Sequence, residues 1–319
     1  MCAGAVKQRA RRADQPPGRA GERGLYMVQA YYVPQTVEEA AGLLEKHAGK
    51  ARIMAGGTDL VLDIKDGKHC PEYLVDITKI KELKQIEARE QTILIGAGVT
   101  HNQAAASALV QGGAACLAQA SSMVGSHQIR NSSTLAGNVV NAQPAADSAV
   151  ALVALGARAR ILTGREEALV PVEELYAGFG KSHVNSSKSI LTGFLVPAEA
   201  GTGSGYMRLQ QRKALALPML CVAAWIRRQE GTVKEARIAM APVGVGPVRA
   251  AEAEHFLLDR EGGEALWSRA GELALKNANP RDSLVRGSRK YRLEVLPALV
   301  REALSMAWED AGRKEEAHG

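Results

Sequence analysis

Two glycine-rich segments about eighty residues apart carry the residue types best suited to holding an anionic ligand. The first covers residues 53–60, and the second covers residues 134–148, where Gly137 and Asn138 stand among small side chains. Glycine leaves backbone N–H groups uncovered and tolerates positive φ, so such segments can donate several hydrogen bonds to phosphate oxygens. Two segments converging on one ligand suggest a dinucleotide, with its pyrophosphate and its ribose or ribityl hydroxyls. Taken singly, each segment is also what an ordinary turn looks like.

Other catalytic patterns are missing from the sequence. Gly96 and Gly98 follow an expected strand, but Thr100 and His101 stand where the third glycine of the GxGxxG motif belongs. No acidic residue follows about twenty positions on, so the sequence lacks the dinucleotide-binding fingerprint of the Rossmann fold. There is no GxxxxGK[ST], HExxH or GxSxG motif, and the seven histidines are scattered. The sequence therefore offers neither catalytic residues for a hydrolase nor ligands for a metal.

Composition narrows the class of protein further. The chain has 319 residues, 46% of them apolar and 23% charged, as expected for two globular domains. Aromatic residues make up only 4%, so the chain has few side chains on which nucleic-acid bases could stack. Residues 1–26 carry about four of the six net positive charges, which leaves the rest of the chain nearly neutral, so a nucleic-acid partner is not expected. Four isolated cysteines indicate neither a zinc site nor an iron–sulfur cluster. No apolar run is long enough for a membrane span and the N-terminus has no secretory signal pattern, so we expect a cytoplasmic protein.

The elements that must position the two segments can be placed from periodicity. Residues 1–26 have the composition of a disordered basic tail, and we expect Met27 to be the natural first residue. Thr36 should cap a helix that runs to His47, because Glu39 completes a capping box. The composition of residues 199–205 predicts a linker. The remaining expected strands cover 51–55, 73–77, 92–96, 158–162, 189–196, 219–227 and 233–241, and the remaining expected helices cover 102–110, 114–124, 147–155, 252–259, 263–276 and 291–306.

Seven short motifs, which follow one another along the chain, give it a resemblance to a known family. It resembles the FAD-binding medium subunit of the molybdenum hydroxylases, the group that includes xanthine dehydrogenase and aerobic carbon monoxide dehydrogenase, from Met27 to about Met306. The motifs are Ala-Gly-Gly-Thr-Asp-Leu at 55–60, Gln-Ile-Arg-Asn at 128–131, Thr-Leu-Ala-Gly-Asn-Val at 134–139, Pro-Ala-Ala-Asp at 144–147, Ala-Pro-Val-Gly at 241–244, Pro-Val-Arg at 247–249 and Arg-Gly-Ser-Arg-Lys-Tyr-Arg at 286–292.

The resemblance implies an α+β fold: a two-subdomain FAD-binding fold of the PCMH/vanillyl-alcohol-oxidase type, followed by an α+β C-terminal domain. The FAD-binding domain would cover residues 27–200, with subdomains of about 27–80 and 81–200. The C-terminal domain would cover residues 201–306, and residues 307–319 would form a charged, frayed tail.

The resemblance also assigns cofactor-binding residues, and no catalytic or metal-binding ones. The first segment would wrap the pyrophosphate, with Asp59 acting through its backbone. Asn138 and Asp147 would bond hydroxyl groups, and Val140 would pack near the isoalloxazine. Arg208 aligns with a lysine near the flavin of the xanthine dehydrogenase branch, or is an inert surface residue. The full set is Ile53, Met54, Ala55, Gly56, Gly57, Thr58, Asp59, Leu60, Thr134, Gly137, Asn138, Val140, Asp147, Leu191 (at the flavin edge) and Arg208.

The function implied is that of an FAD-carrying electron-transfer subunit. Molybdopterin is expected in a large partner subunit and [2Fe–2S] clusters in a small one, with electrons leaving FAD for NAD⁺ or another acceptor. Two alternatives stay open on the sequence: a stand-alone FAD oxidoreductase with its own substrate pocket, and a non-catalytic assembly or docking protein in which the glycine segments are only turns.

Overall fold

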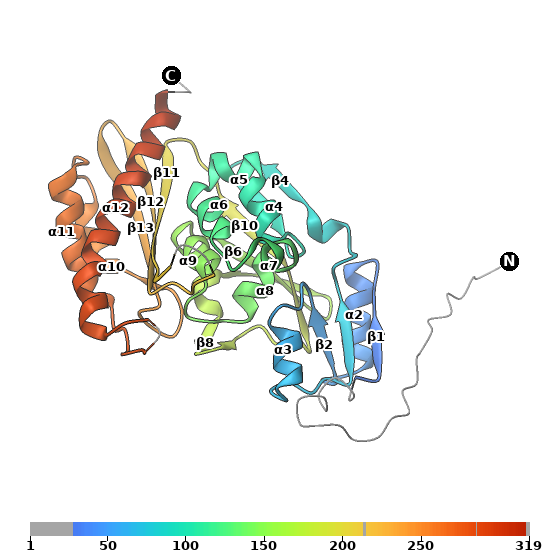
Figure 1. Ribbon diagram of the computed structural model, residues 1–319. Coiled ribbons are helices and arrows are strands. Elements are labelled where there is room, and N and C mark those ends of the chain that lie inside the picture. The colour runs from blue at the N-terminus through green and yellow to red at the C-terminus, as the bar shows by residue number, and fades with distance from the viewer. Residues whose placement is uncertain (1–27, 213–214, 285, 317–319) are drawn as a thin grey trace.

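The computed structural model describes residues 28–212, 215–284 and 286–316, so the expected basic tail at 1–26 and residues 317–319 lie outside the described residues. Three units follow one another from the blue to the red end of the chain (Figure 1). The first is a parallel three-stranded sheet in the order β1-β3-β2, and Thr36 caps its first helix by accepting the N–H of Glu39. Its elements are β1 (Ala30–Tyr32), α2 (Val37–Lys46), β2 (Ala51–Met54), α3 (Leu60–Lys65) and β3 (Tyr73–Asp76).

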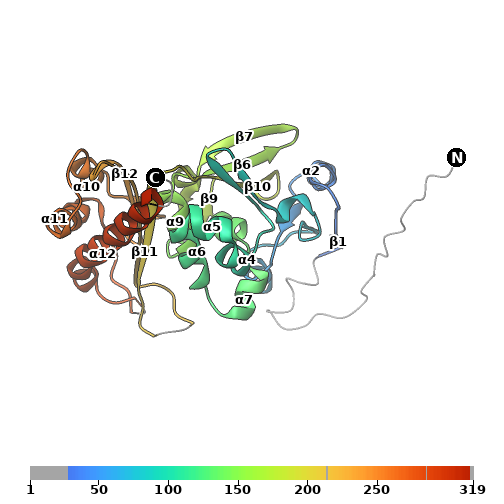
Figure 2. The same ribbon diagram turned by 90° about the horizontal axis from the view of Figure 1, so that it is seen from above.

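The second unit is an antiparallel five-stranded sheet in the order β4-β5-β10-β6-β7, with helices packed along one side (Figure 2). The helix expected over 102–110 is two helices, because Ser107 ends one and caps the next. The elements are η1 (Glu82–Lys84), β4 (Ile86–Arg89), β5 (Thr92–Gly96), α4 (His101–Ala106), α5 (Ala108–Gly113), α6 (Ala115–Ser122), α7 (His127–Ser132), α8 (Leu135–Val140), α9 (Asp147–Ala154), β6 (Arg158–Thr163), β7 (Glu166–Pro171), η2 (Val172–Leu175), β8 (Tyr176–Gly178), β9 (Lys181–Ser182) and β10 (Ser189–Pro197).

The C-terminal unit is an antiparallel sheet in the order β11-β12-β13-β14, buried on both faces. Successive side chains of a strand point to opposite faces, so β12 contributes to two cores. Leu220 and Val222 pack with the C-terminal helices, whereas Cys221 and Trp225 pack into the core shared with the second unit. The elements are β11 (Thr202–Leu209), β12 (Leu220–Gln229), β13 (Thr232–Ala241), β14 (Val248–Arg249), α10 (Ala251–Leu257), α11 (Glu264–Ala274), η3 (Leu275–Asn277) and α12 (Arg289–Glu316).

Two expectations about this unit are wrong. Residues 202–205 are not a linker but the start of β11, and the charged tail expected from residue 307 belongs to α12 as far as Glu316. The carboxylate of Asp310, 7% exposed, accepts the backbone N–H of Ser204 at 3.0 Å and pairs with the Lys314 ammonium at 2.8 Å. The charged residues of the last turns therefore fix the helix to the sheet.

The glycines of β11 permit this close packing, and the effect can be tested at Gly203. A Cβ atom there would lie 2.1 Å from the Ala311 nitrogen and 2.2 Å from the Ala307 oxygen of α12. We expect Gly203→Ala to push helix and sheet apart and lower the free energy of unfolding by about 1–3 kcal/mol, as overpacking does. Urea denaturation should show this loss, whereas the control Gly112→Ala, with nothing within 4 Å of its new Cβ, should stay near the parent. Equal stability of the two variants would contradict this packing argument.

Candidate FAD-binding site

A cavity of about 750 Å³ lies where the first two units meet, and both glycine-rich segments line it. The N-terminal ends of α3 and α8 border it, and the loop at residues 215–217 reaches it from the C-terminal unit. Thirteen of the fifteen residues expected from the sequence line this cavity. They are Ile53, Met54, Ala55, Gly56, Gly57, Thr58, Asp59, Leu60, Thr134, Gly137, Asn138, Val140 and Asp147.

The first segment is held against the chain that precedes α8. Ser132 donates its hydroxyl to the Gly56 carbonyl oxygen at 3.0 Å. A Cβ atom at Gly56 would lie 1.9 Å from the Ser132 carbonyl oxygen, so only glycine allows this approach. Gly57 follows with φ at +69°, in the left-handed region that favours glycine. The two segments are thus brought together by a backbone contact as well as by the shared cavity.

The turn between β2 and α3 has the donors that a diphosphate needs. Within the described residues, no acceptor takes a hydrogen bond from the backbone N–H of Gly56, Gly57, Thr58 or Asp59. Backbone N–H groups are rarely left without a partner, and a run of them around a glycine turn makes an anion-binding concavity. This turn therefore suits the diphosphate of a dinucleotide such as FAD.

Asp59 is the one carboxylate in this turn. Burial raises the pKa of its carboxyl group, and the nearby charge of Asp63 raises it further, while a hydrogen bond from Asn141 acts in the opposite direction. A carboxylate beside a diphosphate would be repelled, so the Asn141 contact and the uncovered N–H of Asp59 favour a role for its backbone. The role expected from the sequence, a contact of the Asp59 backbone with the cofactor, stays a prediction.

The second segment rests on a buried polar cluster that contains His101. Thr134 caps α8 by accepting the Gly137 N–H at 3.0 Å, and the Ser148 hydroxyl lies 2.7 Å from the Asn138 side-chain oxygen. His101 is fully buried, with Nδ1 3.0 Å from the Ser133 carbonyl oxygen and Nε2 3.3 Å from the Ser148 hydroxyl. Burial lowers the pKa of His101 to about 4, so the imidazole is neutral at neutral pH. It links the backbone before α8 to the residue that orients Asn138.

Asp147 is buried at the start of α9, where its carboxylate contacts the side chains of Tyr206 and Arg208 on β11. The Tyr206 hydroxyl donates to its carboxylate at 2.5 Å, and Nη1 of Arg208 lies 3.3 Å from the same oxygen. Desolvation raises the pKa of Asp147 to about 6, and the Arg208 charge limits the rise. Arg208 also donates to the carbonyl oxygens of Met123 and Ala216. The carboxylate is therefore fixed at the cavity wall by a single strand of the C-terminal sheet, β11.

Two expected residues are not part of the lining. The Arg208 side chain is 2% exposed and lies behind Asp147, so its description as a surface residue is wrong. Leu191 lies on β10, is 5% exposed, and packs in the hydrophobic core. Residues that line the cavity but were not expected from the sequence include Arg52, His69, His101, Asn141, Gln143, Ser182, Asn185, Ser186 and residues 215–217.

The described part of the chain contains no group of three or more His, Cys, Asp and Glu side chains placed to hold a metal ion. Among the same residues, no helix has the length and apolar character needed to cross a membrane.

Comparison with known families defines the class of protein. The profile of the family described as the FAD binding domain in molybdopterin dehydrogenase matches residues 26–199, and that of the CO dehydrogenase flavoprotein C-terminal domain matches residues 205–307. The chain belongs to this family of FAD-binding oxidoreductase subunits. The expected α+β fold, an FAD-binding domain followed by a C-terminal domain, is confirmed.

Individual relatives match over nearly their full length. The carbon monoxide dehydrogenase medium chain of Hydrogenophaga pseudoflava is 28% identical over 279 residues, which cover 87% of this chain and 96% of the relative. The xanthine dehydrogenase FAD-binding subunit of Escherichia coli O157:H7 is 27% identical over 288 residues, covering 89% and 98%. The solved structure of carbon monoxide dehydrogenase from H. pseudoflava superposes with a TM-score of 0.82 at 29% identity, covering 88% of this chain and 97% of that one.

Proposed function

We propose that this chain is the electron-transfer subunit of a molybdenum-containing dehydrogenase complex and holds FAD in the cavity between its glycine-rich segments. In this proposal a large partner binds molybdopterin, a small partner carries [2Fe–2S] clusters, and NAD⁺ or another compound is the final acceptor. The observation that carries it is the convergence of both segments on one cavity, with four uncovered N–H groups at Gly56, Gly57, Thr58 and Asp59. The relatives' names, a medium chain and an FAD-binding subunit, support membership of a larger complex.

The residues of this chain act by binding and positioning. When bound, FAD supplies the redox chemistry, and the protein supplies orientation and electrostatic field. The N–H groups of the first turn would take the diphosphate, and Asn138, oriented by Ser148, would take a hydroxyl group of the cofactor. Val140 would pack against the ring system from the end of α8. Neutral His101 would add no charge to the cavity wall near neutral pH.

We further propose a cytoplasmic location. The described cysteines Cys70, Cys116 and Cys221 are all unpaired, as is usual in a reducing compartment. Burial raises the pKa of both Cys116, to about 12, and Cys221, so neither buried thiol is reactive.

The visible spectrum of the protein tests the proposal. The purified chain, incubated with FAD and desalted, should retain a flavin band near ~450 nm. Gly57→Val should stay folded but lose that band. Valine strongly disfavours a φ of +69°, and its Cβ would lie 3.3 Å from side-chain atoms of Met54 and Val61, so the turn should change shape. Full flavin occupancy in the valine variant would count against the assigned turn. Absence of flavin from the parent would contradict the proposal itself.

Anaerobic titration with NADH then tests the acceptor. Bleaching of the retained flavin band would support NAD⁺ as the acceptor, since hydride transfer to and from the flavin must be possible in both directions. A band that NADH leaves unchanged would point to another acceptor.

A further inference from the structure

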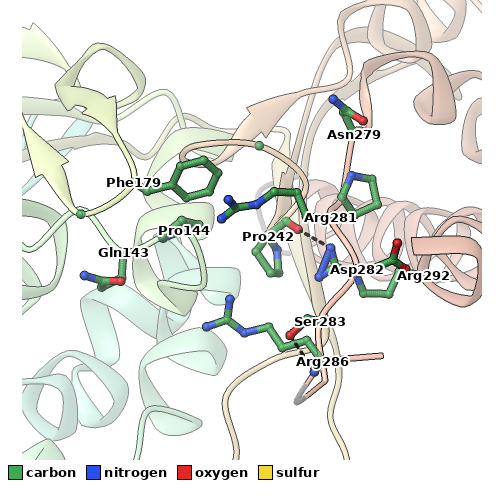
Figure 3. Close-up of a pocket in the computed structure, with 13 residues that line it drawn as sticks. Gln143, Pro144, Phe179, Pro242, Asn279, Arg281, Asp282, Ser283, Arg286 and Arg292 are labelled. Atoms are coloured by element: carbon green, nitrogen blue, oxygen red, sulfur yellow. Dashed lines mark hydrogen bonds between the residues drawn. The ribbon is translucent and has the colours of Figure 1, made fainter. Parts of the chain in front are cut away.

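A second cavity, of about 400 Å³, lies between the FAD-binding and C-terminal domains (Figure 3). It adjoins the FAD cavity, because Gln143 and Gly180 line both. One wall comes from the second unit, and the opposite wall comes from residues 279–283 together with Arg286 and Arg292. A molecule held there would sit at the margin of the flavin site.

Three arginines dominate this cavity. Arg281 and Arg286 extend from the C-terminal domain toward the opposite wall, and the Arg281 guanidinium lies 3.8 Å from the centre of the Phe179 ring (Figure 3). Arg292 is 3% exposed and donates from Nη2 to the Pro242 carbonyl oxygen at 3.1 Å. Stacking on Phe179 and burial of Arg292 hold two of the three cations in place.

Among the described residues these cations form no ion pairs, and Asp282 is the one lining carboxylate whose charge acts on Arg292. None of Arg281, Arg286 and Arg292 forms an ion pair with a described residue. The buried Nε atoms of Arg286 and Arg292 have no hydrogen-bond acceptor among the described residues. The one carboxylate in the lining, Asp282, accepts the backbone N–H of Arg289 at 2.7 Å. The cavity thus carries excess positive charge and unused donors.

This arrangement is unfavourable unless an anion completes it. Burial is the largest cause that lowers the pKa of Arg286 and of Arg292. Repulsion from Arg281 lowers the pKa of Arg286 further, while Cys221 opposes this. Repulsion from Arg286 lowers the pKa of Arg292 further, while Asp282 opposes this. An arginine nonetheless keeps its charge in proteins, so the cost of burying it persists until a counter-ion arrives. The planar guanidinium presents paired N–H donors that match phosphate oxygens. Two or three such groups around one cavity match a multiply charged phosphate.

We propose that this arginine pocket binds the phosphate or diphosphate group of a small molecule that approaches the flavin cavity. The uncovered amides of the first glycine turn already suit the diphosphate of FAD, so the arginine pocket would serve a second molecule. Its position beside the flavin site fits a phosphate-bearing electron acceptor, and in this respect the inference rests on the proposed function. A free phosphate or diphosphate offers the same chemistry.

Calorimetric titration of the FAD-loaded full chain, at fixed ionic strength, tests the pocket with inorganic pyrophosphate and with NAD⁺. We expect Arg281→Gln and Arg286→Gln each to weaken pyrophosphate binding at least about tenfold, the usual scale for a hydrogen bond to a charged group. Arg289→Gln is the matched control, since Arg289 lies on the same segment, is exposed and does not line the cavity. Arg292 is left unchanged because its burial makes a folding defect expected.

The two probes separate the source of the phosphate. Parallel weakening of NAD⁺ binding would identify a dinucleotide as the ligand, and weakening for pyrophosphate alone would identify a free or different phosphorylated compound. Failure of pyrophosphate to bind the parent, or an equal loss in Arg289→Gln, would overturn the proposal. The proposal would also be overturned if the parent bound a glutamate-rich peptide through Arg281 and Arg286 but did not bind pyrophosphate.

A defect in FAD binding can be told apart from a defect in this pocket. Gly57→Val should lose FAD but still bind pyrophosphate in a manner that depends on Arg281 and Arg286. A parent chain that binds pyrophosphate through these arginines but retains no FAD would contradict the proposed function while leaving the phosphate site supported.

Discussion

Gly56→Ala is expected to weaken FAD binding strongly by forcing the two glycine-rich segments apart. The new Cβ would lie 1.9 Å from the Ser132 carbonyl oxygen and 2.6 Å from its carbonyl carbon. Both are backbone atoms, so no side-chain rotation relieves the clash and one segment must move. That movement would displace the turn at residues 57–59 from the wall formed by α8.

The size of the effect follows from the bonds that would be lost. A hydrogen bond to a charged phosphate is worth about 1.5 kcal/mol or more, and losing two of them weakens binding by about 100-fold. The clash itself should lower the free energy of unfolding by about 1–3 kcal/mol. FAD affinity is measured by quenching of flavin fluorescence, and stability by thermal unfolding at a fixed FAD concentration.

Gly42→Ala provides the control for this variant. Gly42 lies inside α2, and nothing lies within 4 Å of a Cβ added there. Alanine favours a helix interior over glycine by about 1 kcal/mol, so this variant should be as stable as the parent or more stable, with unchanged FAD affinity. Unchanged affinity in Gly56→Ala would show that the segments can separate without loss of the site.

The glycine turn, the strand β2 before it and the capped helix α2 could be predicted from the sequence because their signals are local, whereas α3 after the turn was not predicted. The Thr36 cap forms within three residues, and β2 leads directly into residues 55–59, so composition and order along the chain suffice. The second segment was visible as a glycine-rich run, but the helix α8 within it and its cap, Thr134, were not predicted. Convergence of the two segments was expected from their shared chemistry.

Partners far apart in the chain could not be predicted in this way. His101 contacts Ser133 and Ser148, which lie 32 and 47 residues away, and an isolated histidine has no pattern that names such partners. The sequence suggested that Arg208 lies near the flavin or is an inert surface residue, and only its contact with Asp147 explains its burial.

The glycines of residues 199–205 led to the wrong prediction of a linker. In a short window, a run of glycine with serine and threonine indicates a flexible linker. In the structure, Gly203 and Gly205 lie on β11 where α12 crosses the sheet, and the absence of a side chain is what allows contact. The partner, α12, begins more than eighty residues later. Composition therefore identified the small residues correctly but could not reveal the helix that requires them.

Arg208→Met is expected to destabilise the chain strongly and in a way that depends on pH. The substitution would leave the buried Asp147 carboxylate without its cation, and breaking a buried ion pair from one side costs about 3–5 kcal/mol. Arg208 lowers the pKa of Asp147, so its removal should raise that pKa further above about 6. The Tyr206 hydroxyl and a backbone hydrogen bond would remain as partners of the carboxyl group.

The direction of the pH effect follows from proton linkage. In the parent, the pKa of Asp147 is raised from 3.8 to about 6 on folding, so the folded state binds more protons across that range. The free energy of unfolding therefore falls as pH rises through it. In Arg208→Met the fall should continue to higher pH, so the deficit relative to the parent should grow between pH 6 and pH 8 and shrink toward pH 5.

Urea denaturation at pH 5, 6, 7 and 8 measures this deficit. Arg165→Met is the matched control, because Arg165 is exposed and makes no ion pair with a described residue, and it should stay within about 0.5 kcal/mol of the parent. The double variant Arg208→Met/Asp147→Asn removes the unpaired charge, so it should recover part of the stability at pH 8 and lose the added pH dependence. A deficit of equal size at pH 5 and pH 8 would mean that Arg208 acts through its contacts with Met123 and Ala216 rather than through the charge of Asp147.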